Sequence, residues 1–211
     1  MIVKKVEVFG ALCTNAYFYI DEKSGHGFLI DAAAEADKLA AEAAKNHWTI
    51  EKILLTHGHF DHIGAVAELS RKFNAPYLAH REAAKYLLDP QWNLSAWSSA
   101  PIILPDAVYL DDGAIITLAA APSVELQVLH TPGHTLDGIV MYDAAAQTAF
   151  VGDTVFKDAV GRTDLFGGDA AQLAASIKNK ILPLPDVVKL YSGHTEATTV
   201  GAVRQYFSRL G

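Results

Sequence analysis

Four side chains of the types that bind metals stand within six residues, directly after an apolar run at 53–55. They are His57, His59, Asp61 and His62. Side chains alternate in an extended segment, so the imidazoles of His57 and His59 point the same way and can converge on one cation. The backbone turns beyond the strand, where Asp61 and His62 can reach a second cation nearby. This crowding of imidazoles around a carboxylate predicts a metal site.

Three more candidate ligands share one context. His134, Asp153 and His194 each stand beside a glycine, just after a strand-like run. Loops at strand ends are where functional residues collect. One such residue alone would more often be a satisfied polar side chain. The repetition of the same context predicts that these residues meet the first four at a single centre.

The order of these residues resembles that of the metallo-β-lactamase superfamily, in which His-x-His-x-Asp-His is followed by a His, an Asp and a final His. The resemblance covers nearly the whole chain. It implies an α/β fold, the αββα four-layer sandwich, in one domain over residues 1–211. It also implies seven ligands for two metal ions. The first site would use His57, His59, His134 and Asp153, and the second Asp61, His62, His194 and the same Asp153, whose carboxylate would bridge the ions.

Such ligands limit the chemistry. Imidazole and carboxylate suit Zn(II), Fe(II) or Mn(II), whereas structural zinc sites usually recruit cysteine. Two ions about 3.5–4 Å apart can share a water and lower its pKa towards neutrality. We therefore expect two divalent ions, zinc before iron or manganese, and a bridging hydroxide that attacks an activated acyl carbon. Asp61 and Asp153 are the expected catalytic carboxylates, and Asp61 would orient the nucleophile or take its proton.

The substrate follows from further resemblance. Segments 152–156 and 161–165 resemble the glyoxalase II-like branch and the related persulfide dioxygenases. The short, single-domain bacterial subgroup of that branch is the most similar, which implies hydrolysis of a thioester such as S-lactoylglutathione. Secreted β-lactamases fit less well, because many have Arg or Cys in the second site. Flavodiiron oxygen reductases have Glu at the position of His59.

Two alternatives stay open. A persulfide dioxygenase would hold one Fe(II) through His57, His134 and Asp153, with positions left for oxygen and a thiol. Another metallo-hydrolase of the superfamily, such as a lactonase, would use the same two-metal centre. The complete second site favours hydrolysis, since a one-iron oxygenase does not need it. A non-catalytic metal-binding or scaffold protein is disfavoured because no metal ligand is missing.

Arg162 is the expected substrate-binding residue. It stands nine residues after Asp153, where the resemblance places a Lys or Arg that contacts substrate. Its planar guanidinium suits a carboxylate, and glutathione carries carboxylates. The alternative is a structural ion pair with Asp158, Asp164 or Asp169.

Composition is consistent with a compact enzyme. The 211 residues are 51% hydrophobic, enough for one buried core. We expect no membrane span and no secretion signal, and a single cysteine fits the reducing cytoplasm. The net charge of −7, without a basic cluster, disfavours nucleic acid as a partner. The expected partner is a small-molecule thioester, and the oligomeric state is left open.

Strands and helices alternate along the chain to position these residues. Apolar and β-branched runs predict strands at 6–9, 16–20, 27–31, 53–55 and 76–79, and several more from 115 to 151. Helical spacing predicts helices at 35–46, 63–73, 169–180 (with Asp169 as the N-cap) and 199–210. Three prolines predict an irregular, lid-like loop at 89–106.

Other residues receive plainer interpretations. Cys13 is expected to be a small core residue rather than a nucleophile. Trp92 and Trp97 either line a substrate mouth or anchor the 89–106 loop. The four histidines outside the motif are expected on the surface or in packing contacts: His26, His47, His80 and His130.

Overall fold

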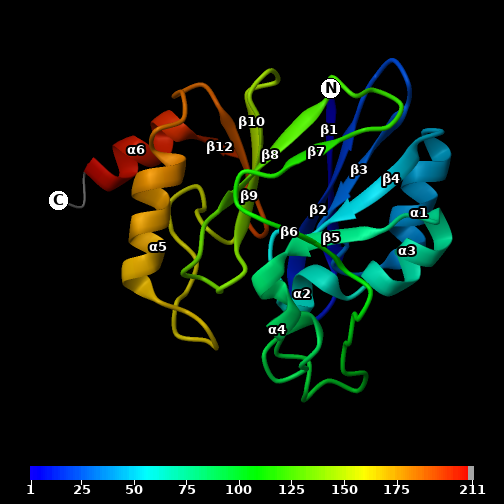
Figure 1. Ribbon diagram of the computed structural model, residues 1–211, viewed down its shortest axis with the longest axis horizontal. Helices are drawn as coiled ribbons and strands as arrows, with labels where there is room; N and C mark the ends of the chain where they lie inside the picture. The colour runs from blue at the N-terminus through cyan, green and yellow to red at the C-terminus, as the bar shows by residue number, and fades with distance from the viewer. Residues whose placement is uncertain (209–211) are drawn as a thin grey trace.

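Two six-stranded β-sheets face one another in the computed structural model, which describes residues 1–208 (Figure 1). The first sheet has the order β1-β2-β3-β4-β5-β6 and the second β12-β11-β10-β9-β8-β7. The first consists of β1 (Ile2–Phe9), β2 (Cys13–Ile20), β3 (His26–Ile30), β4 (Thr49–Leu54), β5 (Tyr77–His80) and β6 (Val108–Leu110). The second consists of β7 (Ile115–Thr117), β8 (Glu125–His130), β9 (Ile139–Asp143), β10 (Thr148–Gly152), β11 (Lys189–Ser192) and β12 (Thr198–Thr199).

Helices cover the outer face of each sheet (Figure 1). On the first sheet lie α1 (Ala36–Lys45) and α3 (Val66–Phe73), and on the second α5 (Ala170–Ser176) and α6 (Val200–Ser208). The shorter helices are α2 (Phe60–Ile63), the 3-10 turn η1 (Arg81–Ala83), α4 (Ala84–Leu87) and the π-helical η2 (Ile177–Ile181), which continues α5. This layering confirms the predicted αββα sandwich.

Alternation along the strands divides the apolar side chains among three layers of core. In β2, Tyr17 and Tyr19 face the second sheet and pack on Phe150, with ring centroids 5.5 and 5.2 Å apart. Phe18 and Ile20 point the other way, into the layer beneath α1 and α3. Because such strands are buried on both faces, their sequences read as nearly continuous apolar runs.

The predicted helix at 63–73 is wrong at its N-terminal end. The chain forms α2 and α3 as separate helices. The amide of Ala65 donates to the carbonyl of Ala32 at 2.9 Å, and this bond to another segment replaces the helical one. The break leaves Asp61 and His62 on their own turn of helix.

Other predicted elements are confirmed with shifted ends. α1 and β1 occupy the predicted positions, although β1 begins earlier, at Ile2. The Asp169 carboxylate caps α5 by accepting from the amide of Gln172 at 2.9 Å. The predicted helix at 199–210 is observed up to Ser208, and its last two positions lie outside the described residues. The edge strand β6 was not predicted, because three half-exposed residues give little pattern.

The loop at 89–106 has no helix or strand, as predicted. Trp92 anchors it, since its ring packs on Tyr86 at 5.4 Å and on Phe166 at 5.9 Å. Trp97 does not anchor it, because its residue is 78% exposed. The interpretation of Cys13 as a core residue is wrong: it is exposed where the turn between β1 and β2 ends.

The histidines outside the motif lie in packing or surface positions, as predicted. His80 of β5 stacks on His130 of β8 at 3.9 Å, which joins the two sheets. His26 contacts Glu51, and His47 is exposed. Within residues 1–208, no helix is both long and apolar enough to cross a bilayer.

Candidate metal centre

The predicted ligands converge from four strand ends and one short helix. In the second sheet, β10 and β11 run parallel, so their carboxyl ends meet at one edge. His57 and His59 follow β4, His134 follows β8, Asp153 follows β10, His194 follows β11, and Asp61 and His62 lie on α2.

Three buried imidazoles form the first group. His59 Nδ1 lies 3.2 Å from His57 Nε2 and 3.0 Å from His134 Nε2. The ligand atoms of all three lie within 4.8 Å of one another. Ring nitrogens this close can share a cation through their lone pairs.

The second group contains Asp61, His62 and His194, whose ligand atoms also lie within 4.8 Å of one another. His194 Nε2 is 3.4 Å from His62 Nε2 and 3.2 Å from Asp61 Oδ2. Because α2 turns at the end of the metal segment, Asp61 and His62 face His194. The His62 ring also lies 4.2 Å from the His57 ring, so the two groups meet there. Two imidazoles with one carboxylate suit a second divalent ion.

The Asp153 carboxylate lies between the two groups. Oδ1 is 3.5 Å from His62 Nε2, and Oδ2 is 3.3 Å from His194 Nε2 and 3.7 Å from His134 Nε2. Oδ1 is buried and has no hydrogen-bond partner among residues 1–208. A buried carboxylate oxygen without a partner is costly unless a cation satisfies it. The site therefore fits divalent metal.

Three ligand imidazoles are oriented by a hydrogen bond on the far side of the ring. Nδ1 of His62 donates to Asp31 Oδ2 at 2.9 Å. Nδ1 of His134 donates to the Arg162 carbonyl at 2.7 Å, and Nδ1 of His194 to the Cys13 carbonyl at 2.8 Å. A proton fixed on Nδ1 leaves the Nε2 lone pair for metal.

Asp31 is the functional residue that sequence reasoning missed. The sequence pattern predicts it at the end of a strand at 27–31, but its φ of 53° takes it out of β3. Its carboxylate is buried and accepts from the Thr56 amide at 2.8 Å and the Thr56 hydroxyl at 2.7 Å. Asp31 thus fixes both the start of the metal segment and the ring of His62. The available signal was an acidic residue ending an apolar run.

Charge differs between the two groups. Burial lowers the pKa of His57 well below its ordinary value, with further lowering by neighbouring imidazoles. Burial, reinforced by His134, lowers the pKa of His59 to about 3. These imidazoles are neutral at physiological pH, which is the form that binds metal.

The two imidazoles of the second group are held in their protonated form. Burial opposes charge on His62, but Asp153, Asp31 and Asp61 outweigh burial and raise its pKa to about 9. Burial also opposes charge on His194, where hydrogen bonds to Asp153 and Asp61 raise the pKa to about 11. The two protons balance buried carboxylates, and a cation bound there would displace them.

Gly193 permits the close approach of the second group. A Cβ at this position would overlap Asp153 Oδ1 and the His62 ring. The glycine before the last histidine is therefore a steric requirement of the site.

A cavity of 460 Å³ opens over the ligands. Apolar side chains form its walls: Leu12, Phe60, Leu94, Phe156, Val160 and Leu165. Arg162 is the one lysine or arginine among its described lining residues. Its guanidinium donates to both Asp164 oxygens, at 2.7 and 2.8 Å. Of the three acidic partners that the sequence offered to Arg162, Asp164 is the one with which it forms an ion pair. Arg162 also lines the cavity.

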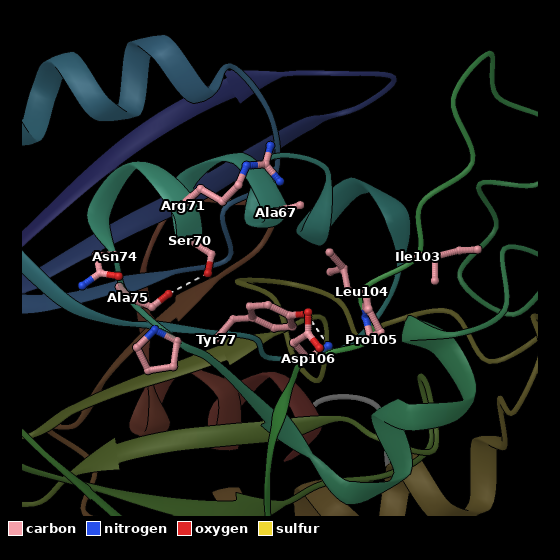
Figure 2. Close-up of a pocket in the computed structure, with 11 residues that line it drawn as sticks. Ala67, Ser70, Arg71, Asn74, Ala75, Tyr77, Ile103, Leu104, Pro105 and Asp106 are labelled. Carbon is pink, nitrogen blue, oxygen red and sulfur yellow. Dashed lines mark hydrogen bonds between the residues drawn. The ribbon is translucent and has the colours of Figure 1, made fainter.

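A separate hollow of 610 Å³ lies beside α3, and Figure 2 shows its lining. Tyr77 lies across its centre, and the Tyr77 hydroxyl accepts from the Asp106 amide at 2.8 Å. None of the seven predicted ligands lines this hollow. The chemistry is therefore expected in the smaller cavity.

Comparisons with known proteins agree with this geometry. The model of the metallo-beta-lactamase superfamily matches residues 10–194. The chain is 34% identical over 184 residues to hydroxyacylglutathione hydrolase GloC of Haemophilus influenzae, covering 86% of this chain and 84% of that protein. It resembles the crystal structure of BLEG-1 B3 metallo-beta-lactamase, with a TM-score of 0.89, 35% identity and 97% of each chain covered. It also resembles TTHA1623 in a di-iron-bound form, with a TM-score of 0.83, 34% identity and 97% and 98% of the two chains covered. The chain therefore belongs to the metallo-beta-lactamase superfamily.

Proposed function

We propose that the protein is a metal-dependent hydrolase of thioesters, of the glyoxalase II-like kind that acts on S-lactoylglutathione. The observation that carries the proposal is the position of Asp153, which faces two complete groups of ligands at once. A centre for two ions is what hydrolysis by activated water requires. The name of the GloC relative supports the thioester class.

Seven residues would hold two divalent ions. Zinc is the preferred candidate, followed by iron or manganese. When bound, the ions would supply a nucleophile from water near neutral pH and polarise the acyl carbonyl. His57, His59 and His134 would hold the first ion, Asp61, His62 and His194 the second, and Asp153 both. The di-iron form of the TTHA1623 neighbour keeps iron among the candidates.

Asp61 has a further role as a catalytic carboxylate. It lines the cavity on the ligand side, and its Oδ2 faces His194 at 3.2 Å. Burial opposes its charge, but His62 and His194 hold the pKa of Asp61 far below its usual range. A carboxylate kept ionised beside the cavity can accept a hydrogen bond from the attacking water and orient it.

The cavity supports a small substrate with an activated acyl group. Its apolar walls exclude water around the reacting carbonyl. Arg162 at its edge would contact an anionic group on the thiol part of a glutathione thioester. The proposed partner is thus a small thioester, and the proposed location is the cytoplasm.

The two alternatives differ in their support. A persulfide dioxygenase with one Fe(II) would need only His57, His134 and Asp153, whereas the second group here is complete. The BLEG-1 neighbour is named a metallo-beta-lactamase, so a β-lactam or a lactone is also a candidate for the same centre.

Metal analysis and an anaerobic assay test the proposal. Protein purified without added metal should contain up to two transition-metal ions per chain. Hydrolysis of S-lactoylglutathione, followed by thiol release, should continue without oxygen. Oxygen consumption with glutathione persulfide, and no thioester cleavage, would assign the dioxygenase instead. Cleavage of a β-lactam or lactone with no thioesterase activity would move the protein to another hydrolase class.

A further inference from the structure

A second hollow of 380 Å³ adjoins the cavity over the metal centre. The two hollows share Leu12, Phe60 and Asp61, so they adjoin one another beside a predicted metal ligand. We call the second hollow the hairpin groove, because the turn between β1 and β2 forms one side. It is lined by residues 10–12, 33–35 and 98–100, with Phe60, Asp61, Gly64 and Ile102.

The charged side chains that line the groove are all carboxylates. Small residues dominate its lining, and no lysine or arginine of the described chain contributes to it. Apart from Asp61, its one charged side chain is Glu35. The Glu35 carboxylate is already engaged, since it accepts from Lys38 and from the Phe9 amide, both at 2.9 Å. The groove therefore suits an uncharged chain and offers no partner to an anion.

The position of Arg162 indicates which side of the centre would hold the thiol part of the substrate and which side the acyl part. Arg162 lines the cavity over the metal centre but not the groove. If Arg162 exchanges Asp164 for a carboxylate of the substrate, an anionic thiol such as glutathione lies on the Arg162 side of the reacting carbonyl. The acyl part is then left to the side without a basic lining residue, where Leu12 and Phe60 line both hollows.

We propose that the acyl group of the substrate extends past Leu12 and Phe60 into the hairpin groove, so that the enzyme selects long, uncharged acyl groups over lactoyl. The inference rests on the proposed thioesterase function and narrows its substrate. A lactoyl group would fill little of a hollow of 380 Å³. A longer chain would bury its methylenes against Leu12, which is 52% exposed.

Acyl length and charge are tested with S-acylglutathiones, which keep the thiol constant. The kcat/KM should rise from S-acetyl to S-butyryl to S-hexanoyl, by up to about fourfold for each methylene that the groove buries. S-succinyl matches S-butyryl in length but adds a carboxylate. It should be hydrolysed at least about tenfold less efficiently, because the groove holds no cation to pair with it.

Variants that fill the groove locate the effect. Ala11 and Ala100 are exposed and line it, so Ala11→Trp and Ala100→Trp should fold normally. Each should bring the ratio of kcat/KM for S-hexanoyl over S-acetyl close to one. Ala174→Trp, on the exposed face of α5, is the matched control and should keep the wild-type ratio. Ala11→Lys should narrow the gap between S-succinyl and S-butyryl.

The outcomes separate the two proposals. If short and long thioesters are cleaved equally well, or if the control lowers the ratio as much as the groove variants, acyl binding in the groove is overturned and the thioesterase function stands. If no thioester is cleaved by protein that contains metal, the proposed function fails and the acyl assignment fails with it.

Discussion

The ring of His62 is held by Asp31, whose Oδ2 accepts from His62 Nδ1 at 2.9 Å. The same carboxylate binds both the amide and the hydroxyl of Thr56. One buried side chain thus connects the strand β3 to the start of the metal segment and to α2. The geometry of the second ligand group depends on a residue that contacts no metal.

Asp31→Asn should weaken metal binding at the second site. The substitution keeps the size of the side chain but removes the charge that orients His62, which typically costs about 10- to 100-fold in affinity. A competition titration with a chromogenic chelator measures the change. Asp37→Asn, at an exposed carboxylate of α1, is the control and should bind metal as wild type does. Unchanged affinity in Asp31→Asn would show that the contact is dispensable.

Asp153→Ala should lower the occupancy of both metal sites. Its two oxygens face His62 on one side and His134 and His194 on the other, so removal takes a ligand from each group. Metal content by mass spectrometry of the purified variant measures the loss. Retention of two ions per chain would contradict the bridging assignment.

Gly193→Ala should damage the centre without unfolding the chain. The added methyl overlaps Asp153 and the His62 ring, so the second group must move apart. We expect a loss of metal at the second site with normal far-UV circular dichroism. Gly113→Ala is the comparison, since that glycine has a φ of 82° and nothing within 4 Å of an added Cβ. It should cost about 1 kcal/mol of stability from backbone strain and keep its metal.

Arg162→Ala should raise KM for an anionic thioester by about 10- to 100-fold, the loss expected for a charged hydrogen bond. The pair with Asp164 is exposed, so its removal should leave the melting temperature and metal content near wild type. Steady-state kinetics with glutathione and N-acetylcysteamine thioesters make the test. Equal losses for the anionic and the neutral thioester would mark Arg162 as part of the scaffold.

Asp137 should make stability depend on pH. Burial raises its pKa from 3.8 to about 7, and the Thr135 side chain opposes this only in part. From about pH 4 to about pH 7 the folded protein retains a proton that the unfolded chain has released, so stability falls as pH rises through this window. The Asp137→Asn variant should lack this fall. Urea unfolding of both chelator-treated proteins across the window provides the comparison, and parallel curves would rule the effect out.

Local sequence pattern was enough to predict most of the strands and the candidate ligands, but not the short edge strand β6. Local alternation decides which face of β2 meets the helices, because successive side chains must point to opposite faces of a sheet. The same alternation makes His57 and His59 point the same way, because one residue separates them in an extended segment. The order of the later ligands was enough to recognise the superfamily, because each of these ligands stands at the end of its own apolar run.

Three features depend on contacts between segments that are distant in the chain, and the sequence pattern did not predict them. α2 and α3 separate because the Ala65 amide binds Ala32, a contact that no helical pattern contains. Asp31 becomes part of the centre only when β3 and β4 pair side by side. The hairpin groove exists because the turn after β1 folds against segments near 34 and 99. Periodicity in the sequence indicates which face of an element a side chain occupies, because this depends only on neighbours along the chain. Hydrogen bonds and cavities between segments depend on which strand ends the fold brings together.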